Sequence, residues 1–166
     1  FLLEGNVTNG VTPKDGISGD PFIPVIKSGG VLQIDAGYIG IRSSTDLIKT
    51  PGIGTAASGS VLLNASMIDI AGALIFDRSV ANASLRATGD IRLTGVPSWD
   101  ALTWSASPTL MGELAVNGNL SLIAAQVYPS TGSTYTISST AANGTITFGR
   151  SGAVTPPTPY SAGGNL

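Results

Sequence analysis

The sequence predicts an all-β protein, and within that class a parallel β-helix, in which short strands from successive turns of the chain stack on one another. Three observations lead to this prediction. Apolar residues alternate with a period of two, similar apolar units recur along the chain, and prolines concentrate between the units. Such alternation is typical of strands that bury one face, and a unit that recurs every roughly 20–50 residues indicates a stacked array.

Four successive units share one pattern: a short strand, a kink of small residues and a second short strand. They lie at residues 31–41, 61–70, 84–93 and 112–122, and GTITFG at 144–149 begins a fifth unit. One apolar residue from each unit gives the repeat, because Ile34, Leu63, Leu85 and Leu114 are separated by 29, 22 and 29 residues. We therefore expect these four residues to stack.

The same alternation predicts the core. Leu63, Ile91 and Leu120 occupy inward positions of three units, so we expect them to be buried. Asp35 and Asp69 occupy outward positions beside inward apolar residues, and we expect solvated side chains there.

The connecting segments favour parallel pairing. They hold seven prolines, at 13, 21, 24, 51, 97, 108 and 129, and no helical pattern. Because a parallel pair needs a crossover, the crossovers must themselves be strands and turns. An antiparallel β-sandwich is the alternative, since Asn-Gly pairs of the kind that form hairpins occur at 9–10, 117–118 and 143–144. We assign residues 29–166 to the repeat segment and expect it to be a piece of a longer protein. Residues 1–28 stay undecided between a lead-in and a segment outside the helix.

The composition excludes several classes of protein. The 166 residues are 42% hydrophobic and only 11% charged, with a net charge of −2. The chain is therefore not disordered by composition, and it lacks the clustered basic residues that nucleic-acid binding requires. Its longest apolar stretch, residues 67–76, is far shorter than the roughly 20 residues of a spanning helix.

The chemistry-bearing residues do not form an active-site motif. Asp35, Asp69, Asp90 and Glu113 fall in the repeating units, whereas a glycosidase needs two carboxyl groups that face one cleft. The chain has neither histidine nor cysteine, and its glycine-rich run at 51–60 has neither the lysine nor the following helix of a phosphate loop. We predict no catalytic residue, no cofactor and no metal site.

Two further patterns bear on binding. SWDALTW at 98–104 is the most unusual local run; we name Trp99 and Trp104 as candidate ligand contacts, because loops on a rigid scaffold often carry binding sites. Coverage of a strand edge is the simpler explanation of these tryptophans. Three tyrosines would complete an aromatic strip for sugars: Tyr128, Tyr135 and Tyr160.

Five N-x-[ST] sequons begin at Asn6, Asn64, Asn82, Asn119 and Asn143. Asparagine and serine are common turn residues, so we favour a structural role over glycosylation. Asn64 follows an inward leucine at a kink, where its amide would bond to a neighbouring turn of the stack.

Most of the chain carries a family resemblance, whose most specific runs lie in its second half. It rests on the runs ATGDIRLTGV (87–96), GNLSLIAAQVYPSTGSTYTI (118–137), NGTITFGRSG (143–152) and SAGGNL (161–166). These runs resemble the repetitive shaft of filamentous haemagglutinin-type exoproteins, the large secreted partners of two-partner (type Vb) secretion in Gram-negative bacteria. AAQVYPSTGSTYTI with the following NGTITF is the most specific part, and the resemblance covers residues 29–166.

The resemblance implies a right-handed parallel β-helix that is exported through an outer-membrane β-barrel transporter and stands on, or is shed from, the cell surface. It also implies a role in adhesion, aggregation or biofilm formation, with a host or cell-surface glycan or protein as receptor. The NPNG-type secretion signature of the family is absent from this chain, so we do not expect the transporter to recognise this segment.

The sequence thus predicts a non-enzymatic structural shaft segment of a secreted adhesin. A carbohydrate-binding module and a carbohydrate-active β-helix enzyme are the alternative hypotheses.

Overall fold

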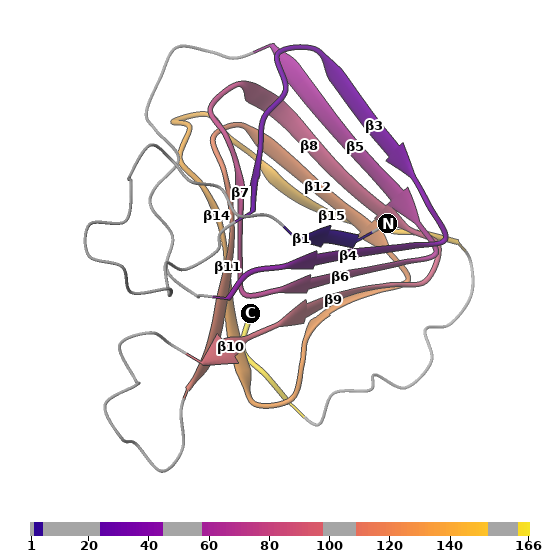
Figure 1. Ribbon diagram of the computed structural model, residues 1–166, viewed down its shortest axis with the longest axis vertical. Helices are drawn as coiled ribbons and strands as arrows, with labels where there is room; N and C mark the ends of the chain where they lie inside the picture. The colour runs from indigo at the N-terminus through magenta and orange to yellow at the C-terminus, as the bar shows by residue number, and fades with distance from the viewer. Residues whose placement is uncertain (1, 5–23, 45–57, 98–108, 153–162) are drawn as a thin grey trace.

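The computed structural model describes residues 2–4, 24–44, 58–97, 109–152 and 163–166. Within these ranges the protein is all-β and contains no helix, which confirms the predicted fold class. The strands form three sheets, which lie along three sides of a triangle around a common interior (Figure 1).

Each sheet collects strands from distant parts of the chain, and we call the sheets A, B and C. Sheet A contains β1 (Leu2–Glu4), β4 (Tyr38–Arg42), β6 (Met67–Ala71), β9 (Asp90–Thr94) and β13 (Gln126–Pro129). Sheet B contains β2 (Val25–Ile26), β7 (Ala73–Phe76), β10 (Val96–Pro97), β11 (Leu110–Val116) and β14 (Ser133–Ser139). Sheet C contains β3 (Val31–Asp35), β5 (Gly59–Ala65), β8 (Val80–Ala87), β12 (Asn119–Ala124) and β15 (Ile146–Arg150).

The chain visits the sheets in a repeated order. β5, β6 and β7 lie in C, A and B; β8, β9 and β11 repeat this order, as do β12, β13 and β14, and β15 returns to sheet C. The pairings between described strands are parallel, apart from the short antiparallel contact of β10 with β11. The β-sandwich alternative requires antiparallel pairs and has no support in this arrangement.

The predicted stacking holds for the first three units and is wrong for the fourth. Ile34 pairs with Leu63, and Leu63 pairs with Leu85. The next residue in this column is Leu122, not Leu114, which lies in sheet B. Units 31–41, 61–70 and 84–93 turn the corner from sheet C to sheet A, but 112–122 turns the corner from B to C.

Alternation cannot distinguish these two corners, because the pattern of strand, kink and strand is the same at both. The spacing of the repeat also changes, because Leu85 and Leu122 are 37 residues apart. The extra residues fall between β10 and β11, two strands that both belong to sheet B. Two of the predicted inter-strand prolines, Pro97 and Pro129, are the last residues of β10 and β13.

The core lies between the three sheets. Leu63, Ile91 and Leu120 have exposed fractions of 1%, 0% and 1%, which confirms their predicted burial. Among the described residues, every buried side-chain nitrogen or oxygen has a hydrogen-bond partner, as expected of a well-satisfied interior.

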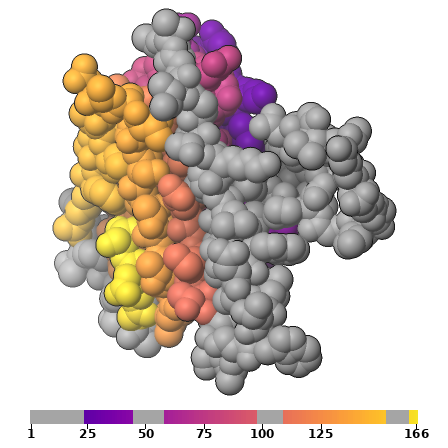
Figure 2. All heavy atoms as spheres, turned by 90° about the vertical axis from the view of Figure 1, so that its left-hand side faces the viewer, coloured from indigo at the N-terminus to yellow at the C-terminus, as the bar shows by residue number. Residues whose placement is uncertain are grey.

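The sheets extend towards both ends of the described chain. Upstream of residue 29, β1 pairs with β4 and β2 pairs with β7. At the other end Asn165 forms a parallel bridge with Thr134 of β14. Figure 2 shows the yellow C-terminal residues beside the orange part of the chain.

Candidate functional site

The tryptophan prediction stays untested, since Trp99 and Trp104 lie outside the described residues, as does Tyr160. Tyr135 is a core residue with 1% exposure, and its hydroxyl donates a hydrogen bond to the Gly72 carbonyl at 2.9 Å. A Cβ at Gly112, its partner on β11, would overlap the Tyr135 ring. The predicted place of Tyr135 in a surface aromatic strip is therefore wrong, because the stack uses glycine opposite tyrosine to bury the ring.

Burial changes the acid–base behaviour of this tyrosine. The loss of water around its hydroxyl, together with the charge of Glu113, raises the pKa of Tyr135 well above its ordinary value of 10.0. Tyr128 shows the same direction of pKa shift, with burial as its main cause, and is 9% exposed. Neither side chain offers an open ring face for stacking on a sugar.

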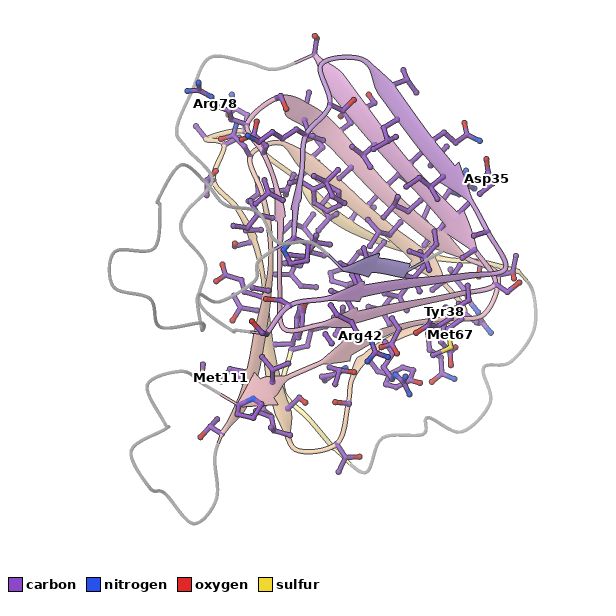
Figure 3. The ribbon with its side chains drawn as sticks, viewed as in Figure 1. Asp35, Tyr38, Arg42, Met67, Arg78 and Met111 are labelled. Atoms are coloured by element: carbon purple, nitrogen blue, oxygen red, sulfur yellow. The ribbon has the colours of Figure 1, made fainter. Side chains whose placement is uncertain are left out.

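Asp35 has the exposed setting that the sequence predicts (Figure 3). Its carboxylate accepts hydrogen bonds at 2.7 Å from Asn64 Nδ2 and at 2.7 Å from Gln33 Nε2. These two bonds, that of Asn64 above all, lower the pKa of Asp35. Asn64 therefore links β5 to β3, as expected of a structural asparagine at this kink.

A second asparagine link crosses sheet C. Asn119 Nδ2 donates to Asn82 Oδ1 at 3.0 Å, and Asn119 Oδ1 accepts from Thr145 Nα and Oγ1 at 3.1 and 3.0 Å. Asn82 and Asn119 are register partners on β8 and β12. Their sequons thus coincide with a polar ladder that ties successive strands together.

Asp69 differs from its prediction, because its carboxylate is nearly buried, with 9% exposure. Arg92 donates to it through Nε, at 3.1 Å from Oδ1, and through Nη2 to Oδ2 in an ion pair. The Tyr38 hydroxyl donates to Oδ2 at 3.3 Å, and Thr94 Oγ1 donates to Oδ1 at 3.5 Å. We call Tyr38, Asp69, Arg92 and Thr94 the sheet A cluster.

The strand register explains this cluster. Gly40, Asp69, Arg92 and Tyr128 occupy one outward column of β4, β6, β9 and β13. Gly40 has no side chain, and the hydroxyl of Tyr38, two residues earlier on β4, donates to Asp69. The hydrogen bonds from Arg92 to Asp69 raise the pKa of Arg92. Sequence reasoning missed the ion pair, although IDI (68–70) and IRL (91–93) place the two charges at equivalent positions of neighbouring units.

A shallow groove of about 320 Å³ lies beside this cluster on the outer face of sheet A. Its lining includes Arg42, Asp69, Ala71, Arg92, Thr94 and Ser130. Figure 3 shows Tyr38, Met67 and Arg42 on the side of sheet A that faces away from the other two sheets. The groove therefore lies outside the core and is open to solvent.

The chemistry available in the groove is limited. Both Asp69 oxygens already accept hydrogen bonds, and Arg92 neutralises the charge. No second carboxylate lines this groove, so it lacks the acid and base pair of a glycosidase. Among the described residues, no three acidic, histidine or cysteine side chains gather in a way that could hold a metal ion.

Comparisons of the chain with family models, with curated proteins and with solved structures found no match. In the described part of the chain there is no helix that is long and apolar enough to cross a membrane. Within its described residues the chain is thus an all-β protein of three predominantly parallel sheets.

Proposed function

We propose that this chain is a non-enzymatic shaft segment of a large secreted bacterial adhesin, built as a right-handed parallel β-helix. The observation that carries the proposal is the repeated passage of the chain through sheets C, A and B with parallel, in-register pairing. A stack in which each turn contacts only its neighbours can be lengthened by adding turns. Such an architecture suits a stiff spacer.

Features on both sides of the sheets support a mechanical role. Inward columns of apolar residues fill the interior, and one column runs through Ile34, Leu63, Leu85 and Leu122. On the outside, the sheet A cluster and the asparagine ladder join successive strands by hydrogen bonds. These polar residues serve the stack itself and leave no assembled catalytic group on the groove of sheet A.

The place in the cell follows from the resemblance of residues 87–96, 118–137 and 143–152 to filamentous haemagglutinin-type shafts. On this proposal the parent protein passes through an outer-membrane β-barrel transporter and adheres at the cell surface to a glycan or protein receptor. The absence of cysteine suits a chain that crosses the oxidising periplasm before it folds.

Small-angle X-ray scattering combined with circular dichroism tests the shaft proposal. We expect an all-β spectrum and a scattering curve that fits a stack of parallel turns spaced by about 4.8 Å. A curve that fits only a two-layer sandwich would contradict the proposal.

Turnover assays on polysaccharides test the enzyme hypothesis, and we expect no turnover by the purified chain. Turnover that is lost in both Asp35→Asn and Asp69→Asn would overthrow the non-enzymatic assignment. A glycan array with the variant Trp104→Ala tests the module hypothesis, and saturable binding that this variant abolishes would favour it.

A further inference from the structure

We propose that Asn143 is a site of spontaneous deamidation and that this change loosens β15 from sheet C. The inference goes beyond the shaft proposal and does not depend on it. It concerns the Asn-Gly pairs at 117–118 and 143–144. Both lie where the chain passes from sheet B to sheet C, and neither forms a hairpin, because the flanking strands belong to different sheets.

Deamidation uses the backbone nitrogen of the residue that follows an asparagine. The nitrogen of Gly144 loses its proton and attacks Cγ of Asn143. The new C–N bond closes a five-membered succinimide, and ammonia leaves with the proton. Water then breaks one of the two bonds between this nitrogen and the ring carbonyls, which gives aspartate or isoaspartate without any transfer of electrons. Glycine favours ring closure, because it has no Cβ beside the attacking nitrogen.

Asn143 is placed for this reaction. It is exposed in the turn between β14 and β15, and its side chain forms no hydrogen bond with the described part of the chain. The N–H of Gly144 donates to the Ala141 carbonyl at 3.0 Å. This bond is local to an exposed turn, so it opens without the separation of any strands.

Asn117 is followed by the same residue but has a different setting. It is half-buried, and its Oδ1 accepts a hydrogen bond from Thr140 Oγ1 at 3.0 Å. The carbonyl of Gly118 accepts another from Ser139 Oγ at 2.8 Å. Both donors belong to the next turn of the chain. Rotation of the Asn117 side chain towards the nitrogen of Gly118 breaks the bond to Thr140, so the fold protects Asn117.

The position of Asn143 gives deamidation a structural consequence. Two residues later, Thr145 donates through its backbone nitrogen and Oγ1 to Asn119 Oδ1 at 3.1 and 3.0 Å, and its carbonyl accepts from the Leu120 nitrogen at 2.8 Å. Isoaspartate directs the chain through Cβ and Cγ, which lengthens the backbone ahead of Thr145 and adds a carboxylate. Among the described strands only β12 pairs with β15, so the displacement of Thr145 loosens this strand.

Mass spectrometry of the purified chain, incubated at mildly alkaline pH and sampled over time, tests the proposal. One tryptic peptide, residues 93–150, contains both Asn117 and Asn143, so fragment spectra compare the two sites within one molecule. We expect deamidation at Asn143 to be about tenfold faster than at Asn117, the effect of one protecting hydrogen bond. In concentrated urea the two rates should become equal.

Two variants provide matched controls. Thr140→Val removes the hydrogen-bond donor to Asn117 and should speed the deamidation of Asn117 alone. Asn143→Gln replaces the reacting side chain with a longer amide that closes the corresponding ring slowly, so it should prevent the change at this position. Circular dichroism should show the native spectrum for both variants.

Hydrogen exchange measures the loosening of β15. After incubation, the amides of β15 should exchange faster than in freshly purified protein, because the strand opens more readily. The variant Asn143→Gln, incubated in the same way, should keep the exchange rates of fresh protein.

Three results would overturn the proposal: no deamidation of Asn143, equal rates at Asn117 and Asn143 in the folded protein, or unchanged exchange of β15 once Asn143 is deamidated. The first means that the turn holds the Asn143 side chain away from Gly144. The second means that the fold does not distinguish the two sites, and the third that sheet C tolerates the longer backbone. None of them alters the scattering result, so the shaft proposal stands or falls separately.

Discussion

At residue 69 the alternation correctly places a carboxylate on the outer face of sheet A, yet its surroundings are not those of a solvated side chain. Arg92, Tyr38 and Thr94, which come from β9 and β4, enclose it. Residues 23 to 31 positions apart in sequence meet because adjacent strands are in register. The outer face of a parallel sheet can therefore hold an ordered polar network.

Asp69→Asn tests the contribution of this network to stability. We expect the free energy of unfolding to fall by about 1 kcal/mol, because an amide accepts fewer hydrogen bonds and carries no charge for Arg92. We expect only this small loss of stability because the Arg92 side chain is 41% exposed, so water screens its ion pair with Asp69. Urea denaturation followed by circular dichroism measures it.

The comparison for this prediction is Asp35→Asn, which alters an exposed carboxylate and should lower the unfolding midpoint by less than Asp69→Asn does, because its hydrogen bonds to Asn64 and Gln33 are open to water. Equal midpoints for Asp69→Asn and the unchanged protein would show that the cluster adds nothing to stability.

Tyr135→Phe tests the buried hydroxyl. Removal of its hydrogen bond to Gly72 should lower stability near pH 7 by about 1 kcal/mol. The folded-state pKa of Tyr135 is raised above its ordinary value of 10.0, so the unfolded chain releases this proton more readily. Tyr135 thus reduces the stability of the fold as pH rises above 10.

The variant should therefore lose less stability between pH 9 and pH 11 than the unchanged protein, which urea titrations at the two pH values measure. Parallel losses in both proteins would show that the hydroxyl is not buried in solution.

At the scale of an element, β5 shows how one strand serves two environments. Its burial alternates from Gly59 to Ala65, with Val61 and Leu63 inward and Leu62 outward. β5 pairs with β3 on one side and β8 on the other, so a change in its inward residues affects three turns of the stack.

Leu63→Asp should unfold the protein, because an unpaired charge in the core costs several kcal/mol. Leu62→Asp is the matched control, since the same change on the neighbouring outward residue leaves the charge in contact with water. Circular dichroism should show loss of the native spectrum for the first variant alone. A native spectrum for Leu63→Asp would contradict the register of β5 described above.

The less drastic variant Leu63→Ala measures how much the buried leucine contributes to the free energy of unfolding. We expect it to lower the free energy of unfolding by about 2–5 kcal/mol, the usual cost of a cavity at a buried leucine.

For the whole molecule, the absence of histidine removes the only side chain whose ordinary pKa lies near neutrality. We therefore expect stability to be flat between about pH 5.5 and 8. The folded-state pKa of Asp35 is below its ordinary value of 3.8, so its contribution is complete above 3.8 and is lost as pH falls through the folded value.

Thermal unfolding at half-unit pH steps measures this profile, which should be level at neutral pH and decline only in acid. A step in the melting temperature near pH 6.5 would contradict it, because the pKa shifts of Asp35 and Asp77 are downward and those of Tyr128 and Tyr135 are upward, away from neutrality.

The sequence by itself determined the fold class, the position of most strands and the inward residues. Each of these depends on local alternation, as the burial of Leu63, Ile91 and Leu120 illustrates. It also indicated the polar link from Asn64, because the kink is a local feature.

Only the tertiary structure decided which units stack and which polar residues meet. Leu122 rather than Leu114 follows Leu85 in the stack, since alternation is identical at every corner of the three sheets. The pairing of Asp69 with Arg92 and the burial of Tyr135 opposite Gly112 both depend on register between strands that are distant in sequence. Register is a property of neighbouring turns, and alternation within one strand does not specify it.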